Sequence, residues 1–208
     1  MSTDTILTIL NNVGIFAFAI SGFLAAADKK LDLFGGLVIG LVTALGGGTL
    51  RDLLLNTEIG WISNVNYIYI GLGGGIAAWL FRSFISRLRK TLFIFDTVGL
   101  GLFTVFGLEK ALSFEVDPTI AVMFAVMSAS FGGVIRDTLC NDIPLLFRQE
   151  IYGTACLAGA LCYLFLQSFG VPPRMNLLFS GLLIIGIRVL AVRFKLALPI
   201  VNTRMKKS

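Results

Sequence analysis

The sequence contains no histidine, and charged residues make up only 14% of its 208 positions. The absence of imidazole side chains excludes a histidine-dependent catalytic triad, an imidazole metal site and a histidine proton relay. A soluble domain carries about 25% charged residues, so the scarcity of charge also argues against a water-soluble fold. No nucleophile constellation replaces the missing histidines. We therefore expect no enzyme activity and no cofactor.

Cysteine is also scarce. The three cysteines, Cys140, Cys156 and Cys162, lie among apolar residues without the spacing of a zinc or redox site. We interpret them as small buried side chains. The 17 basic residues exceed the 12 acidic ones and give a net charge of +5. Their distribution favours membrane orientation over nucleic-acid binding, so we expect no nucleic-acid partner.

Apolar residues are abundant: 56% of the chain is hydrophobic, and the mean hydropathy is +0.89. A globule of this size could not bury that much apolar surface. We therefore predict an all-α integral membrane protein surrounded by lipid. Seven spans of about 20 residues each would leave about 68 residues for short loops and tails. The predicted spans are about 5–27, 33–55, 66–85, 91–112, 118–140, 151–169 and 177–195.

The basic residues predict how these spans are oriented. With seven spans, twelve of the 17 basic residues share one side of the membrane, Lys110 and Arg174 lie on the other, and three fall inside spans. The positive-inside rule then places the C-terminus in the cytoplasm and the N-terminus outside. No positive charge precedes the first apolar run. We therefore interpret this run as a retained span and not as a cleaved signal peptide.

The sequence also contains an internal repeat. Residues 11–80 align with residues 96–165 without a gap at a shift of 85 positions. An Arg-Asp pair, its preceding glycines and a following asparagine all match, and compositional bias alone would not align them. The matches include Gly14/Gly99, Phe18/Phe103, Gly22/Gly107, Asp32/Asp117, Gly47/Gly132, Gly48/Gly133, Arg51/Arg136, Asp52/Asp137, Asn56/Asn141, Tyr67/Tyr152 and Gly74/Gly159.

Each copy of the repeat holds three spans, so the second copy enters the membrane from the opposite side. We predict two inverted three-helix repeats, residues 1–90 and 91–170, followed by a seventh helix and basic tail at 171–208. Transport proteins commonly have this architecture, with the permeation or binding site at the repeat interface near the midplane.

Glycines interrupt the second and fifth spans. Gly46, Gly47 and Gly48 lie in the second, and Gly132 and Gly133 follow Phe131 in the fifth. Consecutive glycines cost roughly 1 kcal/mol each in a helix relative to alanine and permit a bend. We favour kinked, broken helices whose freed carbonyls face a pathway and bind K⁺ or Na⁺ transiently, with no fixed metal site. Close packing of two helices is the alternative.

Arg51-Asp52 and Arg136-Asp137 follow these glycines directly. An ionisable group at membrane depth costs several kcal/mol unless it is paired or hydrated, so these residues are candidates for a pathway or gate. Pairing across the repeat, Arg51 with Asp137 and Arg136 with Asp52, is geometrically attractive. The alternative is that both pairs lie near span ends, where arginine reaches the interface and aspartate caps a loop.

Asp96 lies near the start of the fourth span and aligns with Asn11. Its carboxylate could attract cations at a pore mouth or cap the helix at the interface. Five hydroxyl side chains could add polar groups along a pathway, although such groups often bond to their own helix backbone. They are Ser21, Thr43, Thr104, Ser128 and Ser130.

The duplicated Gly-Gly-x-x-Arg-Asp in a chain of three, three and one spans resembles the trimeric intracellular cation channel family. Its prokaryotic members, also classed as a "glycine transporter" family, are the more similar. The resemblance covers about residues 8–195 and rests on residues 46–52 and 132–137. It implies a homotrimer in a bacterial or archaeal plasma membrane, with a pore in each protomer lined by the first, second, fourth and fifth spans. The implied activity is permeation of K⁺ and Na⁺.

Two functions therefore compete. The first is a passive channel for K⁺ and Na⁺, in which the Arg-Asp pairs neutralise the intramembrane arginines and could act as a gate. The second is a secondary transporter of a small zwitterion such as glycine, in which an arginine would hold the carboxylate and an aspartate the amine. The inverted repeat is typical of both. Membrane lipids are the expected surroundings in either case.

Overall fold

The computed structural model describes residues 3–82 and 88–199, and every regular element in them is a helix. Each of the seven predicted spans coincides with one of the longer helices, and the third span's last predicted residues, 83–85, lie outside the described part. Two short helices, α3 and η2, fall in connections where none was predicted. In chain order the helices are α1 (Thr3–Asp28), α2 (Leu33–Leu54), α3 (Gly60–Ser63), α4 (Asn66–Phe81), α5 (Leu88–Leu112), α6 (Pro118–Leu139), η2 (Leu145–Phe147), α7 (Gly153–Ser168) and α8 (Pro173–Arg193).

Five of these helices are long and apolar enough to cross a membrane: α1, α2, α5, α6 and α8. The helices α4 and α7 are shorter, with 16 residues each. The helix α8 corresponds to the seventh predicted span, 177–195, and begins four residues before it, at Pro173. The fixed φ of proline suits the first turn of a helix.

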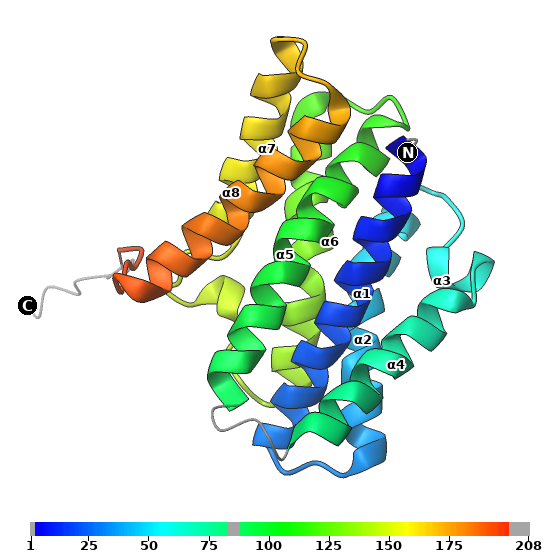
Figure 1. Cartoon of the computed structure of the whole chain (residues 1–208), viewed down its shortest axis with the longest axis vertical. Coiled ribbons are helices and arrows are strands. Elements are labelled where there is room, and N and C mark those ends of the chain that lie inside the picture. Colours follow the sequence, from blue (N-terminus) through cyan, green and yellow to red (C-terminus); the bar gives the residue numbers. More distant parts are fainter. Residues whose placement is uncertain (1–2, 83–87, 200–208) are drawn as a thin grey trace, which may run out of the picture.

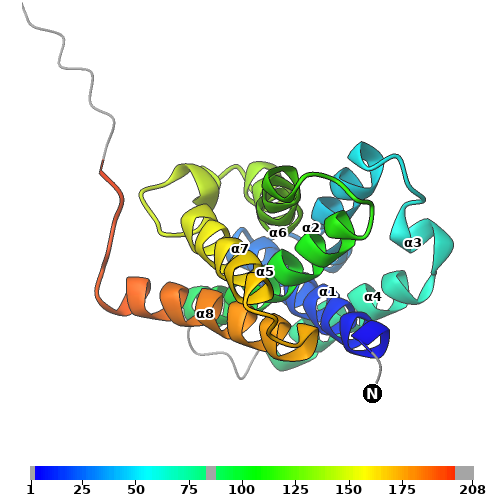
Figure 2. The same ribbon diagram turned by 90° about the horizontal axis from the view of Figure 1, so that it is seen from above.

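The four helices α1, α2, α5 and α6 form the centre of the molecule. Within this group, α1 packs on α2 and α5, and α6 packs on α2 and α5. Figure 1 and Figure 2 show α4 on one flank of this centre and α7 with α8 on the other. Where α1 meets α5, the rings of Phe18 and Phe103 lie 5.2 Å apart between their centroids. These two residues are aligned by the repeat.

Helix ends have the same local structure at positions 85 residues apart. Asp32 caps α2 by accepting a hydrogen bond from the Gly35 amide, and Asp117 caps α6 by accepting one from the Thr119 amide. Asn56 and Asn141 follow α2 and α6 with φ of 52° and 55°. This left-handed conformation ends a helix, and asparagine tolerates it better than most residues.

Polar and apolar residues are distributed the opposite way from a water-soluble protein. Large apolar side chains cover the outside, as Phe34 and Phe169 show with exposed fractions of 76% and 70%. The buried set instead includes charged and hydroxyl side chains, among them Arg51, Asp96 and Arg136. Lipid is the solvent in which such an exterior is stable, and buried charge in lipid points to function.

The glycine runs do not interrupt their helices. Residues of α2 and α6 are helical through Gly46–Gly48 and through 131–133, so the predicted break with freed carbonyls is wrong. A bend without loss of helical structure stays a prediction. The glycines serve close packing at this point: a Cβ on Gly47 would collide with the Ser128 carbonyl oxygen, and one on Gly132 with that of Thr43. The antiparallel helices α2 and α6 therefore cross backbone to backbone.

Candidate functional site

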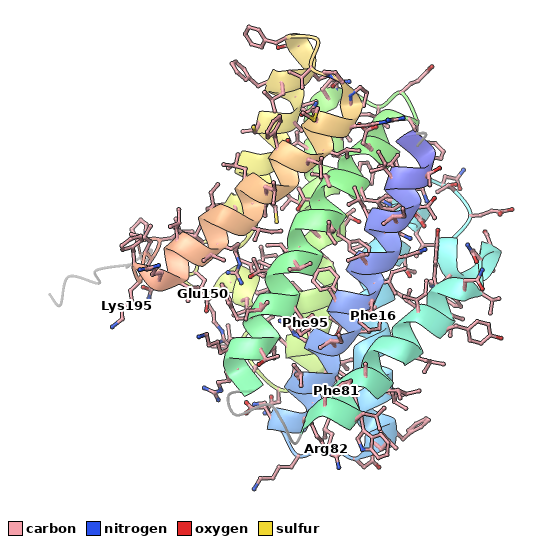
Figure 3. All side chains as sticks on the ribbon, in the orientation of Figure 1. Phe16, Phe81, Arg82, Phe95, Glu150 and Lys195 are labelled. Atoms are coloured by element: carbon pink, nitrogen blue, oxygen red, sulfur yellow. The ribbon has the colours of Figure 1, made fainter. Side chains whose placement is uncertain are left out.

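Two clusters of charged side chains lie inside the four-helix centre, one near the C-terminal end of α2 and one near that of α6. The first cluster consists of Arg51, Asp52 and Lys110. The second cluster consists of Asp96, Arg136, Asp137 and Arg188. Because α2 and α6 run antiparallel, the two clusters lie on opposite sides of the crossing at Gly47 and Gly132. Figure 3 draws the side chains of the described residues as sticks on the ribbon.

In the first cluster, Asp52 is held by two cations. The Nε and Nη2 atoms of Arg51 lie 2.8 and 2.7 Å from Asp52 Oδ1, and Lys110 Nζ lies 2.8 Å from the same oxygen. The other carboxylate oxygen accepts a hydrogen bond from the Gly60 amide at 3.0 Å. Two cations against one carboxylate leave this cluster with a net positive charge.

A cavity of about 70 Å³ adjoins the first cluster. Arg51, Asp52 and Lys110 line it, together with the amide of Asn11 and the ring of Tyr67. The residues that line the cavity come from α1, α2, α3, α4 and α5. It has polar partners and enough volume for a few water molecules or a small solute.

In the second cluster, Arg136 is held by two carboxylates. Its Nε atom lies 2.8 Å from Asp137 Oδ1, and its Nη1 atom lies 2.5 Å from Asp96 Oδ1. Asp137 Oδ2 accepts a hydrogen bond from the Leu145 amide at 3.0 Å, as Asp52 does from Gly60. Arg188 of α8 lies 3.5 Å from the second oxygen of Asp96. Arg188 also lies 3.4 Å from the partly exposed carboxylate of Glu150, so two arginines face two buried aspartates and one glutamate at the edge of the cluster.

The pairing within these clusters corrects one expectation. Arg51 and Arg136 each bind the aspartate that follows them in the chain, and the cross-repeat pairs Arg51 with Asp137 and Arg136 with Asp52 are not formed. Each arginine also donates a hydrogen bond to a hydroxyl group on another helix. Arg51 donates to Ser128 on α6 at 3.2 Å, and Arg136 donates to Ser21 on α1 at 2.6 Å.

The remaining predicted residues lie in four different surroundings. Asp96 lies two turns inside α5 and is fully buried, so the helix-cap interpretation is wrong. Thr104 and Ser130 donate hydrogen bonds to carbonyls of their own helices, at Leu100 and Val126. Gly46 and Phe131 line two separate, open and mainly apolar hollows. Gly48 and Gly133 lie next to the Nη2 atoms of Arg51 and Arg136, at 3.7 and 3.6 Å from an ideal Cβ.

The sequence reasoning missed Lys110 and Arg188 as members of the site. Lys110 was counted among the loop residues, whereas its ammonium group reaches back to Asp52. Arg188 is one of the three basic residues that fall inside the predicted spans, and the repeat gives it no counterpart. Its position inside an apolar run was the signal, because a buried guanidinium requires a carboxylate partner.

Comparisons with known proteins agree with this architecture. A family model described as "Glycine transporter" matches the chain twice, at residues 8–83 and 93–168. The UPF0126 inner membrane protein YadS of Escherichia coli is 36% identical over 193 residues, which cover 91% of this chain and 93% of YadS.

Solved structures are similar over almost the whole chain. A trimeric intracellular cation (TRIC) channel orthologue from Rhodobacter sphaeroides has a TM-score of 0.88 at 35% identity and covers 92% of this chain and 100% of its own. A structure described as the basis for conductance through TRIC cation channels has a TM-score of 0.84 at 34% identity, covering 98% and 99%. The chain is therefore an integral membrane protein that belongs to the trimeric intracellular cation channel family, among its prokaryotic members.

Proposed function

We propose that this protein is a channel for the monovalent cations K⁺ and Na⁺, with a hydrophilic path inside each protomer of a homotrimer. The observation that carries the proposal is the burial of both charge clusters between helices whose outer faces are apolar. Charged side chains are retained at membrane depth where they serve an ion pathway. The structural relatives, which are cation channels, support the same class of activity.

The proposed path runs from the cavity beside the first cluster, past the crossing of α2 and α6, to the second cluster. Asp52, Asp96 and Asp137 attract cations, and the arginines paired with them keep the path closed until the pairing changes. Ser21, Ser128, Thr104 and Ser130 offer hydroxyl oxygens.

The proposal includes an arrangement in the membrane. The seven longer helices span the bilayer as two inverted three-helix units, residues 1–90 and 91–170, with α8 and the tail at 171–208. The N-terminus lies outside and the C-terminus in the cytoplasm of a bacterial or archaeal inner membrane. Native mass spectrometry in mild detergent tests the homotrimer, and a spectrum with only monomers or dimers contradicts it.

A secondary transporter of a small zwitterion such as glycine is the second candidate. The first cluster offers a guanidinium and a carboxylate beside a cavity of about 70 Å³, which is the pair of groups that a carboxylate and an amine require. The description of the matching family model favours the same substrate class. An inverted repeat is common to channels and transporters.

Flux into vesicles reconstituted with the purified protein separates the two functions. A channel passes K⁺ down its gradient with no organic solute present, whereas a transporter takes up labelled glycine with saturation. We expect K⁺ flux that Asp52→Asn reduces severalfold. Asp28→Asn is the matched control, because it removes an exposed carboxylate at the end of α1. Saturable glycine uptake without K⁺ flux would overturn the channel.

A further inference from the structure

The last long helix, α8, lies outside the duplicated residues, yet it buries a charge. Arg188 on α8 is 0% exposed, and its neighbours come from α5, α7 and the segment before α7. The guanidinium carbon lies 5.0 Å from the centre of the Phe93 ring and 4.7 Å from that of Tyr152. Two aromatic faces hold a guanidinium plane in a fixed orientation.

In this orientation the Arg188 guanidinium faces Asp96, another member of the second cluster. Its Nη2 atom lies 3.5 Å from Asp96 Oδ2, the oxygen that Arg136 does not contact. Its Nη1 atom lies 3.4 Å from Glu150 Oε2 and donates to the Ile151 carbonyl at 3.3 Å. Asp96 is therefore shared between two arginines, one from the repeated part of the chain and one from α8.

Comparison of the two halves explains why this second arginine is present. Asp96 occupies the position that Asn11 occupies in the first half, so the second half contains one additional buried acid. Two aspartates and one arginine would leave that cluster with a net negative charge in a low-dielectric interior. Arg188 supplies the missing positive charge from outside the repeat.

The end of α8 is fixed to the segment that carries Glu150. The Leu198 amide donates a hydrogen bond to the Gln149 carbonyl at 2.7 Å, and Ala197 forms a bridge with Glu150. Figure 3 shows Glu150 and Lys195 near one another at this end of α8. A displacement of α8 therefore carries Glu150 with Arg188 and changes the contact of Arg188 with Asp96 on α5.

We propose that Arg188 is a positioning residue for ion permeation: it holds Asp96 against Arg136 and sets the charge of the second half of the path. The proposal rests on the channel function proposed above. It assigns α8 a part in conduction beyond packing or anchoring the C-terminus. Arg188 acts through Asp96 and is not itself in contact with a permeating ion.

Single-channel recording and reversal potentials in asymmetric KCl test the proposal. In Arg188→Met, Asp96 and Asp137 share one arginine. We expect the ratio of K⁺ to Cl⁻ permeability to rise, and the K⁺ conductance at low salt to change by about twofold or more. The double variant Arg188→Met/Asp96→Asn leaves one buried arginine and one buried aspartate, so the buried charges balance again, and it should return both quantities toward the parent. A purely structural role for Arg188 does not produce this rescue.

Arg193→Met is the matched control, because it removes an exposed arginine from the same helix. Arg188→Lys keeps the positive charge and replaces Arg188→Met as the test if the methionine variant does not fold. We expect Arg188→Lys to retain the parental ratio of K⁺ to Cl⁻ permeability. Arg188→Lys with a shifted ratio, or a folded Arg188→Met that behaves like the parent, overturns the role of Arg188 and leaves the channel standing. A parent protein that passes no K⁺ overturns the proposed function instead.

Discussion

Arg51 and Arg136 occupy matching positions, but their surroundings carry different charges. Arg51 shares Asp52 with Lys110, whereas Arg136 alone contacts Asp137 and shares Asp96 with Arg188. Loss of Arg51 leaves Asp52 with a cation partner. Loss of Arg136 leaves Asp137 with no cation partner among the residues that the structure describes.

This difference predicts unequal effects on stability. Arg136→Met should lower the free energy of unfolding by about 3–5 kcal/mol, the usual cost of stranding a buried charge. Arg51→Met should cost less, because the Lys110 ammonium group remains 2.8 Å from Asp52. Denaturant unfolding in detergent measures both, with Arg193→Met as the surface control. Equal losses for the two variants would contradict the asymmetric pairing.

The glycines at the helix crossing give a second prediction. Gly47→Ala and Gly132→Ala each place a methyl group against a backbone carbonyl, which cannot move as a side chain can. We expect each to destabilise the protein by about 1–3 kcal/mol, the range for overpacked positions. Gly73→Ala is the control, since a Cβ there meets nothing within 4 Å. Thermal unfolding that leaves Gly47→Ala as stable as Gly73→Ala rules out the close crossing.

At the scale of elements, α1 and α5 occupy matching places but differ in one buried group. Asn11 on α1 lines the cavity beside the first cluster, whose net charge is positive, and its counterpart on α5 is Asp96. Asn11→Asp therefore adds a carboxylate where the other half already has one. It should raise K⁺ conductance at low salt by about twofold or more by attracting cations to the cavity.

Single-channel recording checks this prediction, and Asn66→Asp is its control. Asn66 is exposed at the start of α4, so the same charge is added outside the buried cluster. Conductance that falls or stays unchanged in Asn11→Asp, with the control at the parental value, contradicts a cation path through this cavity.

The elements also show what the sequence could and could not predict. Apolar runs located the seven longer helices. The repeat aligns Asp32 with Asp117, and both cap a helix in the structure, because capping depends on local sequence. The role of Gly47 could not be predicted, since glycine permits both a helix break and a close helix crossing. Which of the two occurs depends on the helix that faces Gly47. Asp96 was misplaced because α5 begins at Leu88 and not at residue 91. Lys110 was missed because its partner is 58 residues away.

At the scale of the whole molecule, the charge distribution predicts topology. A reporter active only in the cytoplasm should give signal when fused after Ser208, because twelve of the 17 basic residues share that side. The same reporter in the 56–65 connection should be silent, and in the 141–151 connection it should be active. Signal from the 56–65 connection overturns the orientation.

The pairing of each arginine with its next neighbour has a consequence for biosynthesis. Residues of α2 are inserted into the bilayer before α5 and α6 have been synthesised, so Lys110 and Ser128 are not yet there to contact Asp52 and Arg51. The bond between Arg51 Nε and Asp52 Oδ1 needs no other helix, and the same holds for Arg136 and Asp137. Each helix can therefore enter lipid with its two charges already neutralised within itself, and the partners from other helices join them during later assembly.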